Sequence, residues 1–319
     1  MVQDGCEYCF IEVSSHSLNQ ARVYGLNFNG GVFTNLSNDH LDYHKTFSEY
    51  RDAKKSFFDI LNKEAFALVN KDDKNSLKML EGTVAKKLTY SLKSFSTHTC
   101  KVLENRFEGM LLQINKVDVF VKLIGEFNAY NILAVYGVAK QLGIDDFELL
   151  TALSMLESPE GRFQFFRNKN GITGIVDYAH TDDALKNILT AINTIRSNSE
   201  SLITVFGCGG DRYKSKRPIM ARIACNLSTQ VILTSDNPRT ENPNDIINEM
   251  IAGLDTLQKK KVLAISDRRQ AILAATKIAN KNDVILVAGK GHEKYQEIKA
   301  SKVPFDDMKE LKQSLNIIF

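Results

Sequence analysis

The chain has 319 residues, of which 43% are hydrophobic and 25% charged, and its formal net charge at pH 7 is +3. This length suits two ordinary domains with cores of their own, and the composition is that of a globular protein rather than a disordered one. The charge is small, no Lys/Arg stripe contains interleaved aromatics, and no apolar run could span a bilayer, so we expect neither a nucleic-acid nor a membrane partner.

The first 158 residues mix strand-like and helical patterns. Short apolar runs with polar ends predict buried strands at residues 9–13, 31–35 and 66–70. Alternation between residues 88 and 123, with turn signals at Glu108-Gly109 and Asn115-Lys116, predicts antiparallel hairpins at a sheet edge. An apolar face predicts a helix over residues 128–142. The turn-rich residues 157–161 predict a linker, and thus domains at 1–158 and 159–319.

After the linker, strands and helices alternate regularly. Apolar runs of strand length occupy residues 172–178, 202–206, 231–234, 262–265 and 284–287, and a helical pattern follows most of them. This rhythm predicts an α/β fold with a doubly wound, mostly parallel sheet. Asp267, just before a helical pattern, is expected to be a helix cap.

A polar cluster in the first region is a candidate cation site. Asp39, His40, Asp42 and His44 follow the apolar run at residues 31–33, and Lys54 follows on an amphipathic segment. Oxygen and imidazole donors suit magnesium or manganese. A polar loop beside a solvated helix face is the alternative. Cys6 and Cys9 form a CxxC without a second pair, so we expect reduced thiols in a cytoplasmic protein.

In the second region, four predicted strands end in unusual polar residues, at 177–180, 207–212, 236–239 and 289–293. Any one of these endings alone would be interpreted as a turn or cap. Open parallel sheets, however, bind ligands beyond the carboxyl ends of their strands. Four such endings on one edge predict a crevice with carboxylates and guanidinium groups, which suits a zwitterion.

Both regions resemble the Mur ligase family. TNLSNDHLDYHKTFSEYRDAK (34–54) and EVSSH (12–16) resemble motifs of its central domain, and DYAHTDDAL, FGCGGDRYKSKRP, DNPR and AGKGHE resemble motifs of its C-terminal domain. Asp182, Tyr213 and Ser215 depart from the family's Pro, Asp and Gly. The resemblance implies a partial central domain, with a mixed sheet and helices, followed by a doubly wound, Rossmann-like C-terminal domain. It covers nearly the whole chain but only the later part of the family's length.

The resemblance also implies functional residues. Glu12, His40 and Lys54 would hold Mg²⁺, the lysine as an anionic carbamate. A UDP-muramoyl peptide would contact Ser14, Gln20 and Arg22. ATP would lie near a set that the resemblance places along the nucleotide cleft: Asn128, Asn131, Arg162, Asp177 and His180. Two alternatives stay open, because Asn128 could cap a helix and His180 could be a loop imidazole satisfied by the backbone.

The DNPR motif resembles that of family members that add meso-diaminopimelate. The implied site comprises Arg212, Asp236, Asn237, Pro238, Arg239, Gly289 and Glu293. Arg212 and Arg239 would hold carboxylates, and Glu293 would bind the ammonium group. Lysine lacks the second carboxylate that a guanidinium can bind through two hydrogen bonds, so a buried arginine would discriminate against it.

No G-x-x-x-x-G-K-[ST] phosphate loop occurs in the sequence. The family's loop precedes the segment that resembles EVSSH, so the chain resembles a ligase without its first domain and the start of its second. One hypothesis is therefore an ATP-dependent ligase that joins meso-diaminopimelate to UDP-MurNAc-L-Ala-D-Glu through an acyl phosphate, in peptidoglycan precursor synthesis. A second is a non-catalytic truncated fragment that retains substrate sites. A related folylpolyglutamate-type ligase is a weaker third. We expect a monomer.

Overall fold

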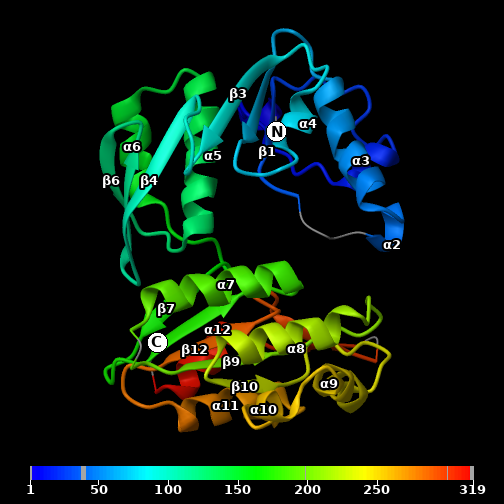
Figure 1. The fold of residues 1–319 in the computed structure, drawn as a ribbon, viewed down its shortest axis with the longest axis vertical. Coiled ribbons are helices and arrows are strands. Elements are labelled where there is room, and N and C mark those ends of the chain that lie inside the picture. Colours follow the sequence, from blue (N-terminus) through cyan, green and yellow to red (C-terminus); the bar gives the residue numbers. More distant parts are fainter. Residues whose placement is uncertain (1, 37–40, 198, 300, 317–319) are drawn as a thin grey trace. The chain divides into compact units, whose positions relative to one another are not determined.

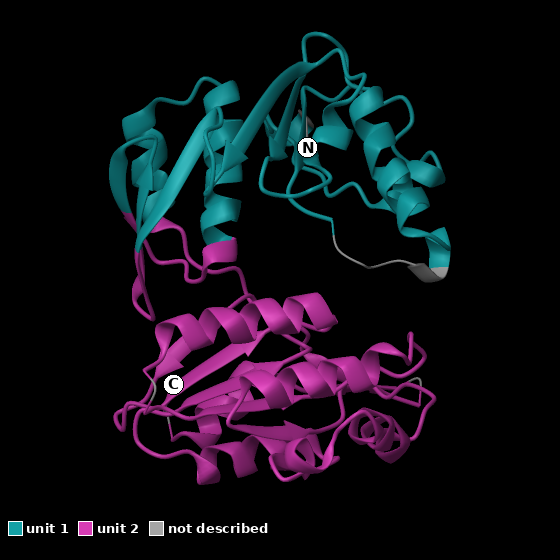
Figure 2. Ribbon diagram, viewed as in Figure 1, with its two compact units in different colours: residues 1–103, 111–119, 128–154 teal, residues 104–110, 120–127, 155–319 magenta. Residues whose placement is uncertain are grey.

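The computed structural model describes residues 2–36, 41–197, 199–299 and 301–316. The chain divides into two compact units, which Figure 2 shows in different colours. Unit 1 comprises residues 1–103, 111–119 and 128–154, and unit 2 comprises residues 104–110, 120–127 and 155–319. The main division thus follows residue 154, and two short segments from the end of the first region's sheet group with unit 2. The domain limit at residue 158 stays a prediction.

A sheet of six strands occupies the first half of the chain, with its strands in sequence order: β1 (Gly30–Phe33), β2 (Phe66–Asn70), β3 (Lys86–Ser91), β4 (His98–Arg106), β5 (Gly109–Ile114) and β6 (Val117–Val121). The pairs from β1 to β4 are parallel. Two-residue turns join β4 to β5 and β5 to β6, a length that only antiparallel neighbours allow. Asn115 and Lys116 both have positive φ, as a type I′ turn requires. The predicted hairpins are confirmed, although the first turn lies one residue earlier.

The predicted strand at residues 9–13 is wrong. This segment has no regular structure, and Phe10 is 75% exposed. Its apolar residues have high strand propensity, but a strand also needs a neighbouring strand to pair with its backbone N–H and C=O groups. The helices of this half are α1 (Ser15–Asn19), α2 (Leu41–His44), α3 (Phe47–Asp59), α4 (Ser76–Leu80), α5 (Glu126–Gln141) and α6 (Asp146–Met155), after a short 3₁₀ turn, η1 (Val2–Asp4).

The core of unit 1 forms where α3 covers the sheet. Thr46 begins this helix by accepting a hydrogen bond from the Glu49 N–H. Phe57 and Phe58 are buried on α3, and Leu61 follows just after it in the same cluster as Phe33 of β1. The amphipathic pattern of this segment is therefore confirmed.

A second sheet of six strands forms unit 2, in the order β11-β10-β9-β12-β8-β7. Its members are β7 (Gln164–Arg167), β8 (Thr173–Asp177), β9 (Leu202–Phe206), β10 (Gln230–Leu233), β11 (Val262–Ala264) and β12 (Val284–Ala288). Five are parallel, and β7 adds an antiparallel edge. The five predicted strands and the doubly wound sheet are confirmed. The strand order reverses where β12 lies between β9 and β8.

Helices cover both faces of this sheet (Figure 1). One core cluster contains residues of α7 (Asp182–Ile195), α8 (Lys216–Leu227) and α9 (Pro243–Ala252), and the opposite one contains residues of α11 (Arg268–Ile278) and α12 (Asp307–Ser314). A short helix, α10 (Thr256–Lys259), and a hairpin of β13 (Tyr295–Ile298) and β14 (Ser301–Pro304) complete the unit. Asp267 caps α11 as expected. Among the described residues, no helix combines the length and apolar character needed to cross a membrane.

A fully buried ion pair joins α11 to α12. Arg268 donates from Nε and Nη2 to the two carboxylate oxygens of Asp307, both at 2.7 Å, and both side chains are 0% exposed. The same guanidinium donates to the carbonyl oxygens of Ser235 (3.3 Å) and Ala288 (2.9 Å), just after β10 and at the end of β12. One cation therefore links two helices to two strand ends.

We expect Asp307→Asn to destabilise unit 2 by about 3–5 kcal/mol, because it leaves a buried guanidinium without its counter-charge. Urea unfolding, followed by hydrogen exchange of the β9 and β12 amides, measures the change. Glu310→Gln is the matched control. It breaks the neighbouring pair with Arg269, whose side chain is 60% exposed, and should cost less than about 1 kcal/mol. Equal losses in the two variants would contradict a special role for the buried pair.

Candidate functional site

The candidate site lies at the carboxyl edge of the unit 2 sheet. Ala288 of β12 is in register with Asp177 of β8 and Phe206 of β9, and Phe206 is in register with Leu233 of β10. The four polar strand endings therefore start from one edge, as the sequence predicts. This is the edge at which doubly wound sheets bind ligands.

Two glycines let these loops approach closely. A Cβ on Gly207 would lie 2.2 Å from the Thr234 carbonyl oxygen, and one on Gly289 would lie 2.6 Å from Asp236 Oδ2. Gly289 also has a φ of +114°, in the region that favours glycine. Gly289 thus contributes space and backbone geometry rather than a side chain.

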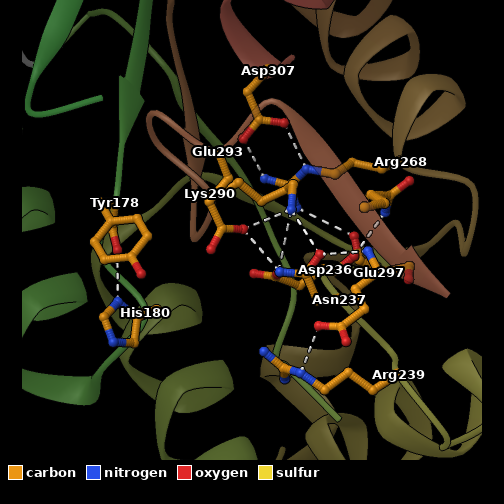
Figure 3. A network of polar contacts seen from close by, with 12 residues as sticks. Tyr178, His180, Asp236, Asn237, Arg239, Arg268, Lys290, Glu293, Glu297 and Asp307 are labelled. Atoms are coloured by element: carbon orange, nitrogen blue, oxygen red, sulfur yellow. Dashed lines mark hydrogen bonds and ion pairs between the residues drawn. The ribbon is translucent and has the colours of Figure 1, made fainter. Parts of the chain in front are cut away.

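The loops after β10 and β12 meet in a polar network, which Figure 3 shows. Asn237 Nδ2 donates to Glu293 Oε2 at 2.8 Å, and the Lys290 ammonium donates to Asn237 Oδ1 and Glu293 Oε2, both at 2.9 Å. Burial raises the pKa of Asp236, although Arg268 and Lys290 oppose this. Burial also acts on Glu293, but hydrogen bonds from Lys290 and Asn237 outweigh it and keep the pKa of Glu293 below its ordinary value. The sequence analysis missed Lys290, although it lies inside the AGKGHE motif.

The Arg239 side chain lies on the rim of this network. Its Nε donates to Glu297 Oε2 at 3.1 Å, and its Nη1 donates to the Gly210 carbonyl oxygen at 2.7 Å. The side chain is 22% exposed and is already paired with Glu297 of its own chain. Arg212 is exposed, and its Cγ would lie 3.7 Å from a Cβ on Gly209, while Arg239 Nη1 would lie 3.0 Å from the same point.

Pro238 shapes this rim through its backbone rather than through a polar group. Its carbonyl oxygen would lie 1.9 Å from a Cβ on Gly210, so the loops after β9 and β10 pack backbone against backbone. Arg239 follows with a φ of +52°, and its N–H and C=O pair with Glu297 and Lys299. The guanidinium position is therefore set by two loops and a hairpin.

Three of the predicted ATP-site residues lie around Tyr178. The Arg162 guanidinium is 5.0 Å from its ring centre, and the His180 ring is 4.7 Å away. His180 Nδ1 lies 3.0 Å from the Tyr178 carbonyl oxygen. This contact fits the alternative in which His180 is a loop imidazole satisfied by the backbone. The buried Asp177 carboxylate accepts from the N–H groups of Phe163 and Ala179, and burial raises its pKa despite these bonds. The sequence analysis did not single out Tyr178 as the centre of this group.

Two further ATP-site candidates lie in unit 1. Asn128 and Asn131 lie one turn apart on α5, and Asn131 Nδ2 donates to Asn128 Oδ1 at 3.2 Å. The helix begins at Glu126, so Asn128 lies inside its first turn and the N-cap alternative is wrong. Both amides remain candidates for a ligand on this helix.

The predicted metal residues are only partly described. Lys54 Nζ donates to the Val13 carbonyl oxygen at 3.2 Å, and Glu12 is exposed nearby. Burial lowers the pKa of Lys54, while the Glu12 charge opposes this shift. His40 lies outside the described residues, as does Asp39, and nothing is described of the Asp42 side chain. Within the described part, no three His, Cys, Asp or Glu side chains form a metal-binding group.

His44 packs inside unit 1, and its predicted place beside a cation stays a prediction, because Asp39 and His40 lie outside the described residues. Its imidazole is buried, with Nε2 at 2.8 Å from Ser15 Oγ, and its ring packs 5.4 Å from that of Tyr50. His44 is two residues after Asp42 in the sequence, and α2 directs its side chain into the packing of α1 and α3.

The predicted contacts for a UDP-muramoyl peptide surround α1. Ser14 Oγ caps this helix by accepting from the Ser17 N–H at 3.1 Å. Gln20 ends the helix and donates to the Tyr43 hydroxyl at 3.4 Å, while Arg22 is exposed beyond it. These three residues therefore lie close together in unit 1, and Ser14 also stabilises the start of α1.

Comparison with known proteins agrees with these features. The model of the Mur ligase middle domain matches residues 1–139, and that of the Mur ligase glutamate ligase domain matches residues 161–291. The chain belongs to the Mur ligase family. The resemblance seen in the sequence motifs is thereby confirmed, and so is the α/β fold.

Similar curated proteins are named UDP-N-acetylmuramoyl-L-alanyl-D-glutamate–2,6-diaminopimelate ligase. That of Parabacteroides distasonis is 56% identical over 98% of this chain and 64% of its own length. That of Cytophaga hutchinsonii is 50% identical over 100% of this chain and 65% of its own length. This Mur ligase chain thus spans about two thirds of the length of the curated relatives it matches.

Solved structures show the same fold. A structure titled as a UDP-N-acetylmuramoyl-L-alanyl-D-glutamate–2,6-diaminopimelate ligase is 36% identical, with a TM-score of 0.66 over 98% of this chain and 65% of the other. A MurF ligase from Thermotoga maritima, solved in complex with ADP, is 17% identical with a TM-score of 0.67 over 95% of this chain and 64% of the other. The latter likeness concerns the fold alone.

We expect Lys54 to form a carbamate with dissolved carbon dioxide. Its lowered pKa means that the reactive neutral amine appears at a lower pH than in an ordinary lysine, so the carbamate should increase as pH rises through that range. ¹³C NMR with labelled bicarbonate should show a carbamate signal that Lys54→Ala removes. Lys55→Ala, which alters the neighbouring lysine paired with Asp59, is the control and should keep the signal. A signal that survives in Lys54→Ala would contradict the assignment.

Proposed function

We propose that this chain carries the middle and C-terminal parts of an ATP-dependent ligase that joins meso-diaminopimelate to UDP-MurNAc-L-Ala-D-Glu. The observation that carries the proposal is the unit 2 sheet edge, where Arg212 and Arg239 lie beside Gly209 and the Asn237–Glu293 pair lies in the adjoining network. Guanidinium groups and a carboxylate on one edge complement a ligand with both carboxylates and ammonium groups. The names of the relatives support the same substrate.

The proposed reaction forms an amide in two steps. The γ-phosphoryl group of ATP passes to the free D-glutamate carboxylate, which gives an acyl phosphate and ADP. The amine of diaminopimelate then attacks the acyl carbon and expels inorganic phosphate, with loss of a proton from nitrogen. Glu12, His40 and the Lys54 carbamate would hold Mg²⁺, which neutralises charge on phosphate oxygens.

The predicted nucleotide contacts form two groups, one within each unit. Arg162 and His180 are arranged around Tyr178, and Asn128 and Asn131 present amides on α5. Asp177 is less suited to direct binding, because its carboxylate already accepts two backbone hydrogen bonds. Its contribution would be to fix the loop that carries Tyr178 and His180.

Selection of diaminopimelate over lysine would rest on Arg239. Its Nε and Nη1 are held by Glu297 and Gly210, which fixes the plane of the guanidinium before a ligand arrives. A carboxylate at the far end of diaminopimelate can bind that plane, whereas lysine offers no such group. Glu293 would take an ammonium group, which both amino acids carry.

Two other hypotheses are less well supported. The names of the relatives favour a ligase over a non-catalytic fragment. A folylpolyglutamate-type ligase is favoured by no observation at the sheet edge, and a folylpolyglutamate synthase of Thermotoga maritima shares the fold at 16% identity. The monomeric state and the cytoplasmic location stay predictions.

We expect Arg239→Ala to weaken meso-diaminopimelate binding by about 1.5–3 kcal/mol, on the order of 10- to 100-fold in Kd, because a charge-assisted pair is lost at a half-exposed rim. Lysine binding should change much less. Calorimetry at high amino-acid concentration measures both affinities.

The matched control for this prediction is Arg222→Ala, which removes an exposed arginine from α8 and should leave both affinities unchanged. If Arg239→Ala weakens the binding of both amino acids equally, the guanidinium only supports its loop. In that case the assignment of diaminopimelate to this motif would be wrong.

A further inference from the structure

Lys290 is a fully buried cation within reach of the candidate site. Its side chain is 0% exposed, while that of Glu293, three residues later, is 19% exposed. The lysine therefore cannot contact a ligand itself, but it contacts residues that can. Figure 3 shows it between Asn237 and Glu293, below the Arg268–Asp307 pair.

The contacts of Lys290 determine how Asn237 is oriented. Asn237 Oδ1 accepts from the Lys290 ammonium and from the Glu297 N–H, both at 2.9 Å. An ammonium group can only donate, so it must face the amide oxygen. The amide nitrogen of Asn237 is thereby directed to Glu293 Oε2, at 2.8 Å.

The same lysine controls the charge and direction of Glu293. Both the Lys290 and the Asn237 bonds end on Oε2, so Oε1 is the oxygen that remains for a ligand in the part of the chain that the structure describes. The Lys290 ammonium is 2.9 Å from Glu293 but 3.9 Å from Asp236. It therefore favours an ionised Glu293 more strongly than an ionised Asp236.

We propose that Lys290 is a positioning residue for the amino-acid substrate, which holds Glu293 as an anion with Oε1 directed to the ligand's ammonium group. The inference rests on the proposed function, which supplies the amino acid. It extends that function by adding a residue that acts only through Glu293 and Asn237. It also predicts a signature different from that of Arg239, since both lysine and diaminopimelate carry ammonium groups, whereas of these two only diaminopimelate carries a second carboxylate.

The test compares the unaltered chain with Lys290→Met, which keeps an unbranched side chain without the charge. The first measurement is the titration of the Glu293 carboxyl by ¹³C NMR, assigned with Glu293→Gln. The side chains of Asn237, Asp236, Arg268, Tyr178 and His292 also interact with this carboxyl and are left unchanged. Loss of the ammonium should raise the pKa of Glu293, because burial is then less opposed.

The second measurement is calorimetry with meso-diaminopimelate and with lysine. Lys290→Met should weaken the binding of both amino acids to a similar extent, raising each Kd on the order of 10-fold. Lys294→Met is the matched control: this exposed lysine lies four residues later and pairs with Glu160 and Asp306, so its loss should change neither the titration nor the binding. If Lys290→Met fails to fold, Lys290→Gln carries the same two expectations.

The outcomes separate the inference from the proposed function. An unchanged Glu293 titration, or amino-acid binding equal to that of the unaltered chain, overturns the role of Lys290. An unaltered chain that binds neither amino acid, together with a shifted Glu293 titration, overturns the proposed substrate but supports the control of Glu293 by Lys290. If only the binding of diaminopimelate becomes weaker, Lys290 acts on the binding of the second carboxylate rather than on that of the ammonium group, and the inference is overturned.

Discussion

The buried Arg268 guanidinium is the constraint on which the candidate site depends. It pairs with Asp307 and also binds the carbonyl oxygens of Ser235 and Ala288, so it fixes the ends of two parallel strands relative to α11 and α12. A buried cation is costly unless it is paired and hydrogen-bonded, and Arg268 has both its counter-charge and four hydrogen bonds, which involve all three of its nitrogens. Once the strand ends are fixed, the loops that follow them start from defined positions.

The loops after these strands are held by further contacts. Gly207 and Gly289 allow backbone contacts that a side chain would block, and Asn237, Lys290 and Glu293 form a closed set of hydrogen bonds. Polar networks of this kind specify one arrangement when every member is satisfied. A site prepared in this way loses little conformational entropy on binding, which favours selection among similar amino acids.

Unit 1 shows a different kind of candidate chemistry. Its candidates around α1 are exposed or engaged in local bonds: Glu12 is exposed, Ser14 caps α1, and Lys54 bonds to a backbone carbonyl. The adjoining apolar residues 9–13 form no strand, and Phe10 among them is 75% exposed. The chain spans about two thirds of the length of its relatives, so the proposed ligase chemistry concerns the longer protein that those relatives represent.

The sequence by itself determined the features that depend on local pattern. The strands of unit 2, the α11 cap at Asp267 and the Asn115-Lys116 turn follow from hydrophobic period, capping chemistry and turn residues, which act over a few positions. Tertiary structure alone decided whether residues 9–13 had a strand partner, that His44 faced the core, and that Glu297 would hold Arg239 from 58 residues away. It also buried Lys290 against Asn237, 53 residues distant. Such contacts are set by the packing of the whole sheet edge, and no local pattern encodes them.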